Sequence, residues 1–167
     1  DAHYTIHCAN GSPAHIFADK VGMKKIIEYN LGSTESTNIK PYAYVSISYF
    51  GECKSFSITM KLSEFNCNYC LGRMGNPQKK TIQKSIQDCA CFVAFIDKQY
   101  VQSNVIDDLR MAISLGKKIA IYQTEECELP EDLADLQSIH QLRYNTGSED
   151  ERTIKLINWL TANKCRD

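Results

Sequence analysis

The sequence lacks the features that would place it among nucleic-acid-binding or membrane-spanning proteins. Its 19 lysines and arginines are balanced by 20 aspartates and glutamates, which leaves a formal charge of -1 and no basic field for a phosphate backbone. Its longest apolar run, from Cys89 to Ile96, is far shorter than the ~20 residues that a membrane-spanning helix requires. We therefore expect no nucleic-acid partner and no membrane span in this chain.

Glycine and proline are also scarce, with 8 and 4 residues among 167, while 43% of the chain is apolar. This composition is typical of a folded globular protein and not of a disordered or fibrous one. The length suits a single core of ordinary domain size. Because the chain starts at Asp1 and shows no charged leader before an apolar stretch, we expect it to be a piece of a longer protein.

Cysteine is present at moderate density. The 8 cysteines fall below the ~8–10% of residues that marks a disulfide scaffold, which favours a reducing, cytoplasmic location. Two pairs are closely spaced, Cys67-x-x-Cys70 and Cys89-x-Cys91, and four thiolates would suffice for zinc. Because the second pair opens an apolar run, we interpret it as core packing and expect neither a metal site nor a cofactor.

Two segments of different character divide the chain. Residues 1–41 contain no convincing strand, and Ser12 and Pro13 are typical of a helix start. The polar stretch from Gly32 to Pro41 is typical of a linker. We predict that residues 1–41 form an N-terminal helix and linker and that residues 42–167 form the main domain.

The main domain alternates short apolar runs with segments of helical period, which is typical of a parallel sheet with crossover helices. Strands are expected at 43–50, 66–71, 89–96, 118–123 and 141–144, and helices at 55–64, 77–88, 104–115, 130–138 and 148–162. We predict an α/β fold, namely a flavodoxin-like doubly wound five-stranded parallel sheet with helices on both faces.

Two of the expected strands differ in polarity. The run from Cys89 to Ile96 is apolar on both faces, so it should be the central strand of the sheet. The first strand places Tyr44, Ser46 and Ser48 on one face, because side chains alternate along a strand. We expect this more polar face to border a cleft.

General nucleotide-binding and hydrolase signatures are missing. No G-x-G-x-x-G follows a strand, and neither G-x-x-x-x-G-K-[ST] nor G-x-S-x-G occurs, which disfavours dinucleotide dehydrogenases, P-loop enzymes and α/β hydrolases. In a doubly wound sheet, ligands lie beyond the carboxyl ends of the strands where the strand order reverses. The segments 51–55, 72–80 and 97–104 are therefore the expected ligand-binding region.

Two adjacent acids, Asp107 and Asp108, stand near the start of the helix after the central strand. In one interpretation Asn104 caps this helix and a first-turn carboxylate favours the positive end of the helix dipole. Successive helical residues diverge by about 100°, so the two acids cannot share one role. If Asp107 supports the helix start, Asp108 can face the cleft.

Four features, in order along residues 42 to about 163, match the pattern of one known family. They are the strand Tyr42 to Tyr49, the loop Arg73-Met74-Gly75-Asn76-Pro77-Gln78, the segment Tyr100 to Leu109, and Trp159 in the last helix. Together they resemble the Toll/interleukin-1 receptor (TIR) domain, with its opening strand box, its Arg-Asp-x-x-Pro-Gly loop, its Tyr, Ser and acid-Leu pattern and its final aromatic box. Met74 and Gln78 depart from the family's Asp and Gly.

The resemblance implies an intracellular signalling module that acts by homotypic self-association. Its partners would be other TIR domains, in a homo-oligomer or filament. The interaction loop would comprise Gly72, Arg73, Met74, Gly75, Asn76 and Pro77. A basic group of Arg73, Lys79 and Lys80 would then meet Asp107, Asp108 or the Glu125-Glu126 pair on a neighbour.

The resemblance also implies an alternative, cleavage of the nicotinamide–ribose bond of NAD+ as substrate, activated by oligomerisation. In TIR domains that cleave NAD+ a glutamate on the third helix is the key acid, and the matching catalytic position here is Asp108. Ser48, Tyr49, Phe50 and Arg73 would line the substrate pocket. Aspartate is one methylene shorter than glutamate, and misplacement on this scale can cost ~100-fold in rate.

A third interpretation is a response-regulator receiver. That fold needs acids after the first strand and a phosphate-accepting aspartate at the end of a strand. Glu52 and Asp97 occupy such places, but no lysine closes the penultimate strand. This interpretation ranks below the other two.

Overall fold

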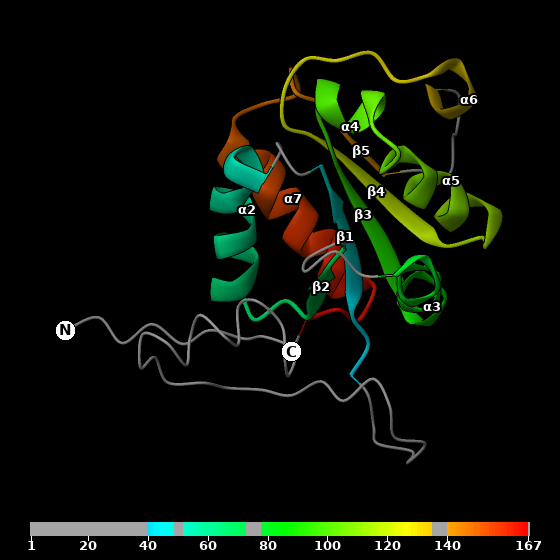
Figure 1. The fold of residues 1–167 in the computed structure, drawn as a ribbon. Coiled ribbons are helices and arrows are strands. Elements are labelled where there is room, and N and C mark those ends of the chain that lie inside the picture. Colours follow the sequence, from blue (N-terminus) through cyan, green and yellow to red (C-terminus); the bar gives the residue numbers. More distant parts are fainter. Residues whose placement is uncertain (1–39, 49–51, 73–77, 135–139, 167) are drawn as a thin grey trace, which may run out of the picture. The chain divides into compact units, whose positions relative to one another are not determined.

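The fold was analysed in a computed structural model, which describes residues 40–48, 52–72, 78–134 and 140–166 (Figure 1). The predicted N-terminal helix lies outside these residues. Five parallel strands form one sheet in the order β2-β1-β3-β4-β5. They are β1 (Ala43–Ile47), β2 (Tyr69–Leu71), β3 (Cys91–Ile96), β4 (Lys118–Gln123) and β5 (His140–Leu142). This is the flavodoxin-like doubly wound order, and the predicted fold class is confirmed.

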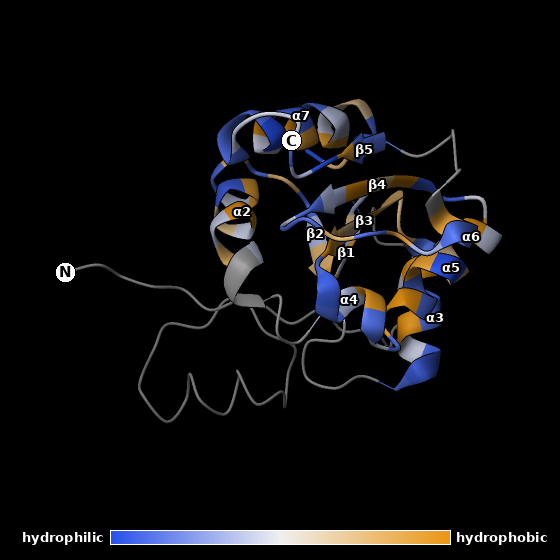
Figure 2. Cartoon of the chain, turned by 90° about the horizontal axis from the view of Figure 1, so that it is seen from above, coloured by the Kyte–Doolittle hydropathy of each residue, from blue (hydrophilic) through white to orange (hydrophobic). Residues whose placement is uncertain are grey.

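Helices lie against both faces of the sheet, as Figure 2 shows from above. On one face are α2 (Glu52–Glu64) and α7 (Glu149–Ala162). On the other are α3 (Lys79–Asp88), α4 (Lys98–Gln102), α5 (Ile106–Ser114) and α6 (Glu131–Ala134). No helix in the described ranges has both the length and the apolar character needed to cross a membrane.

The central strand β3 divides its side chains between two hydrophobic cores. Val93 and Phe95 pack with α2 and α7, whereas Phe92, Ala94 and Ile96 pack with α3 and α5. All residues of β3 are buried, as expected for a strand covered on both faces. The sequence-based assignment of this run to the centre of the sheet is therefore confirmed.

Several element boundaries differ from the sequence-based expectation, among them the start of the third strand at Cys91 and the start of α2 at Glu52. The second strand begins at Tyr69 and not at residue 66, because Asn66 adopts a left-handed conformation with φ 54° that interrupts extended backbone. The helix expected at 104–115 corresponds to α5, and α4 precedes it as a separate helix that the sequence pattern did not predict. The expected start at Asn104 was wrong, since the residue preceding α5 is Val105, whose side chain makes no capping hydrogen bond.

Helix α7 begins where the sequence pattern indicates. The Ser148 hydroxyl accepts a hydrogen bond from the Glu151 N–H at 3.2 Å, and a Glu151 carboxylate oxygen accepts one from the Ser148 N–H at 2.9 Å. This reciprocal capping box satisfies two N–H groups that a helix start otherwise leaves without partners. It fixes the start of the helix that covers β4 and β5.

Candidate functional site

The carboxyl ends of β1 and β3 meet where the strand order reverses, and a buried polar cluster occupies this point. Ser48 directly follows the end of β1, and Asp97 directly follows β3. The Ser48 hydroxyl lies 3.2 Å from each carboxylate oxygen of Asp97 and donates to that carboxylate. Ser48 is 2% exposed and Asp97 3% exposed, so the pair is shielded from bulk water.

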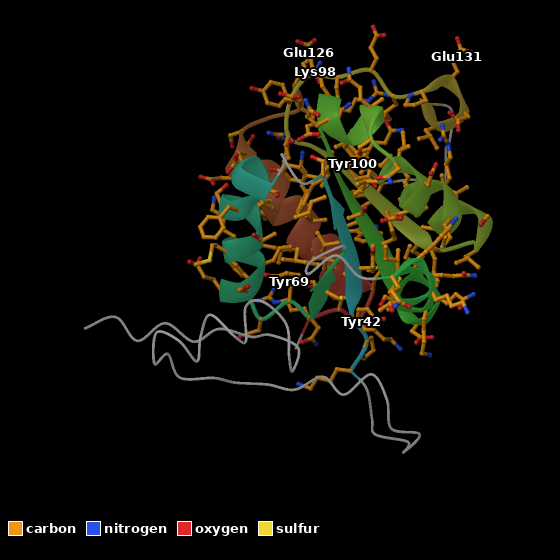
Figure 3. All side chains as sticks on the ribbon, viewed as in Figure 1. Tyr42, Tyr69, Lys98, Tyr100, Glu126 and Glu131 are labelled. Atoms are coloured by element: carbon orange, nitrogen blue, oxygen red, sulfur yellow. The ribbon has the colours of Figure 1, made fainter. Side chains whose placement is uncertain are left out.

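Tyr100, a residue of α4, extends this cluster (Figure 3). Its N–H donates to Asp97 Oδ1 at 2.6 Å, and its hydroxyl donates to Ser46 Oγ at 2.9 Å. We call Ser46, Ser48, Asp97 and Tyr100 the switch-point cluster. A buried carboxylate with several donors is far less costly than an unpaired one, which explains how Asp97 is accommodated in the interior.

The polar face predicted for the first strand therefore lies in the interior, where its serines form hydrogen bonds. We expected this face to border a cleft, but Ser46 and Ser48 are both buried, so that expectation was wrong. Sequence periodicity shows that a strand has a polar face but not what covers it. Here Tyr100 covers it, because the short helix α4 begins immediately after β3 and turns this side chain back over β1.

Asp97 also caps α4. Its backbone is extended, with φ -132° and ψ 179°, and its carboxylate accepts the Tyr100 N–H three residues on. An aspartate between a strand and a helix is a recognised cap signal, and it was the sequence feature that could have revealed α4. These buried bonds argue against the receiver interpretation, because a phosphate-accepting carboxylate has to meet its phosphoryl donor.

The two acids on α5 have different environments, as expected. Asp107 is exposed and pairs with Arg110 Nη1 at 3.3 Å. Arg110 also bonds Asp132 through Nε at 3.0 Å and lowers the pKa of that carboxyl. Asp108 is 3% exposed and lies in the first turn of α5. Of the two acids, Asp108 is the one that points into the protein.

The predicted interaction loop is described only at its first residue. The Gly72 N–H donates to the Val45 carbonyl oxygen at 2.7 Å, and Gly72 packs against the Tyr44 side chain. Residues 73–77, and with them Arg73, lie outside the described residues, as do Tyr49 and Phe50. The pocket that the TIR resemblance implies therefore remains a prediction at these positions.

The pair Cys89 and Cys91 packs in the core as the sequence indicated. Cys89 and Cys91 are 3% and 0% exposed and belong to the two hydrophobic cores. Cys67 is buried, whereas Cys70 is exposed. Among the described residues, no three metal-ligating side chains come together.

A separate hollow of about 700 Å³ opens at the carboxyl ends of β4 and β5. Its lining includes both charges, with Lys98 and Arg143 beside Glu126 and Glu128. Its lining includes Lys98 from the expected ligand-binding segment 97–104, but it includes no residue of the switch-point cluster. We assign no function to it.

The aromatic residue of the last helix has a structural environment. Trp159 stacks on His140 with ring centroids 5.9 Å apart and an interplanar angle of 9°. This contact joins α7 to β5. Trp159 therefore has a packing role beside any part in the family pattern.

Comparison with known proteins adds no assignment: no protein-family model matches the chain, and no curated protein matches it.

Proposed function

We propose that this chain is a TIR-type signalling domain that acts by homotypic self-association. The observation behind the proposal is a separation of exposed charge on the flavodoxin-like domain. Lys79 and Lys80 are exposed at the first turn of α3, and we call them the basic patch. Glu126, Glu128 and Glu131 are exposed between β4 and the start of α6, and we call them the acidic segment.

The two charged surfaces lie on different parts of the domain. Figure 1 places α3 and α6 apart, and Figure 3 labels Glu126 and Glu131 near α4 and α6. Unlike surfaces that attract one another favour head-to-tail contact, and such contacts extend into open assemblies unless they close into a ring. This arrangement suits a scaffold that grows by adding copies of itself.

Fewer acidic residues are available to contact the basic patch than the sequence suggested. Asp108 is buried and cannot reach a neighbouring molecule, and Asp107 already pairs with Arg110. A Glu125 carboxylate oxygen accepts the Lys98 N–H at 2.9 Å. The acidic segment is therefore the better complement to the basic patch.

Charge reversal tests the contact directly. We expect the double variant Lys79→Glu and Lys80→Glu to raise the concentration at which the chain self-associates by at least about tenfold, because like charges then face each other. Light scattering across a concentration series measures this change. The matched control is Lys155→Glu, an exposed lysine on α7, which should leave the assembly concentration unchanged.

Complementary reversal provides a sharper test. The variant Glu126→Lys and Glu131→Lys should also fail to assemble alone, but mixing it with the Lys79→Glu and Lys80→Glu variant should restore assembly. Unaltered assembly in both separate variants would contradict the proposed contact.

Assembly should also weaken as salt is raised, because exposed charges are screened beyond a Debye length of about 8 Å at physiological ionic strength.

A second candidate function is cleavage of NAD+, and it is favoured by the inward position of Asp108 beside the exposed Asp107. A carboxylate can stabilise the oxocarbenium-like transition state of glycosyl transfer. Nicotinamide carries a positive ring nitrogen and leaves as a neutral molecule, so no general acid is needed. Asp108 would then act on the ribose side of the bond that breaks.

Nicotinamide release by the concentrated chain tests this candidate. We expect Asp108→Asn to lower release at least ~100-fold, which is the usual scale for losing one preorganised electrostatic group, while Asp107→Asn leaves it unchanged. Equal loss in both variants would point to a folding defect. No release at a concentration where light scattering shows assembly would reject NAD+ cleavage and leave self-association as the function.

A further inference from the structure

Two cysteine sulfurs that are distant in sequence meet in the core. Cys91 is the first residue of β3, and Cys165 follows α7 by three residues. Their Sγ atoms lie 3.3 Å apart, within hydrogen-bond distance for sulfur, and both residues are 0% exposed. The pair lies on the face of the sheet that α2 and α7 cover.

The backbone around Cys165 is held firmly in place. Lys164 adopts a left-handed conformation with φ 60°, its N–H bonds the Thr161 carbonyl at 3.0 Å, and the Cys165 N–H bonds the Leu160 carbonyl at 3.0 Å. These two bonds form a Schellman motif at the end of α7. The Asn68 N–H also donates to the Cys165 carbonyl at 2.7 Å. The position of the Cys165 sulfur therefore follows from the fold.

Neighbouring residues continue this attachment. Cys67 and Arg166 form an antiparallel bridge, so the segment after α7 is joined to the segment before β2. The Arg166 guanidinium lies 5.4 Å from the centre of the Phe65 ring. The sulfur pair thus links the central strand β3 to the segment after α7, which is also hydrogen-bonded to the segment before β2.

The two thiols are chemically different. A hydrogen bond from the Cys91 thiol lowers the pKa of Cys165, because it stabilises a thiolate there. The same hydrogen bond, together with burial, raises the pKa of Cys91. Cys165 also lies on the segment after α7, whereas Cys91 opens the central strand, so we take Cys165 as the attacking sulfur and Cys91 as the thiol beside it.

We propose that Cys91 and Cys165 form a two-thiol oxidation site at which hydrogen peroxide converts the pair into a disulfide. In the first step the Cys165 thiolate attacks a peroxide oxygen, the O–O bond breaks, and hydroxide leaves and is protonated to water. Cys165 is then a sulfenic acid. In the second step the Cys91 sulfur attacks the Cys165 sulfur, the S–O bond breaks, and a second water leaves. With hydrogen peroxide, the two thiols lose two electrons and the peroxide becomes two waters.

Closing this bond requires a small movement. The sulfurs have to approach from 3.3 Å to the ~2.05 Å of a disulfide. Because both residues are buried, peroxide reaches Cys165 only during transient local opening of the segment after α7, and the backbone bonds that hold this segment bring the two sulfurs together again when it closes. The neighbouring thiol then captures the sulfenic acid before further oxidation.

Peptide mapping of the full chain tests the proposal. The reduced protein is treated with hydrogen peroxide, alkylated, digested without reductant and analysed by mass spectrometry. We expect a cross-linked peptide that joins Cys91 to Cys165, loss of two of the 8 thiols, and recovery of both with dithiothreitol. The melting temperature should rise by about 10 °C on oxidation, because the bond closes a span of 74 residues in the unfolded chain.

Two variants separate this site from general thiol oxidation. Cys70→Ala removes an exposed thiol and should leave the cross-link and the thermal shift intact. Cys165→Ala should abolish both and leave Cys91 reduced. The proposal is overturned if Cys91 and Cys165 of the unmodified sequence remain alkylatable while other thiols are consumed, or if either one cross-links to a different cysteine. The mapping result on the unmodified chain decides this even if a variant fails to fold.

Discussion

Replacing Asp97 by alanine is expected to lower the free energy of unfolding by about 2–4 kcal/mol. The substitution removes the cap of α4, which is worth about 1 kcal/mol. It also leaves the buried Ser48 hydroxyl without this acceptor, and a buried polar group that loses its partner costs about 1–3 kcal/mol. Chemical denaturation followed by circular dichroism measures the loss.

Asparagine at the same position is the matched control. Asp97→Asn keeps a side-chain oxygen that can accept the Tyr100 N–H and keeps nearly the same volume, so it should cost less than Asp97→Ala. Unchanged stability in the alanine variant would show that the switch-point cluster contributes nothing net to folding. A similar loss in both variants would show that the negative charge, and not the acceptor geometry, is what matters.

Replacing Gly72 by alanine is expected to destabilise the fold by about 1–3 kcal/mol, the usual cost of overpacking a core. A Cβ atom at Gly72 would overlap the hydroxyl and ring of Tyr44. Tyr44 is 1% exposed and stacks on Phe92 with ring centroids 5.4 Å apart, so its ring cannot move aside freely. The Gly72 N–H is fixed to the Val45 carbonyl, so the backbone cannot withdraw either.

A double variant identifies the clash as the cause. Removing the whole ring with Tyr44→Ala should reduce the effect of Gly72→Ala, because the overlap involves ring carbons as well as the hydroxyl, so the two changes should be non-additive. Gly116→Ala is the comparison, because an added methyl there meets open space and the cost arises from the left-handed backbone at φ 63°. Tyr44→Ala should not change the effect of Gly116→Ala. Additive behaviour at Gly72 would rule out the overlap as the source of instability.

Much of the fold could be predicted from local patterns. The run from Cys89 to Ile96 indicated a central strand because it is apolar on both faces, and β3 has this position. The capping pair Ser148 and Glu151 lies at the predicted start of α7. Helix α4 escaped prediction because its five residues are too few to display a period, and only Asp97 marked its start.

The candidate site was less accessible to prediction. The sequence placed Asp107 and Asp108 at a helix start and required that they face different ways, which follows from helical geometry. It could not show which acid is buried, because that depends on how α5 packs against β3 and α3. The same holds for Ser48, whose polar character was evident but whose partner, Asp97, was not.

By itself the sequence determined the class of the fold and the alternation of strands and helices, because these follow from apolar patterns with periods of two and 3.6 residues. Only the tertiary structure decided the contacts between Ser48 and Asp97, Tyr100 and Ser46, and Cys91 and Cys165. Their partners are 49, 54 and 74 residues apart in sequence. Such pairs form because the order of the strands and the packing of α7 on the sheet bring the residues together. No local sequence pattern encodes that order.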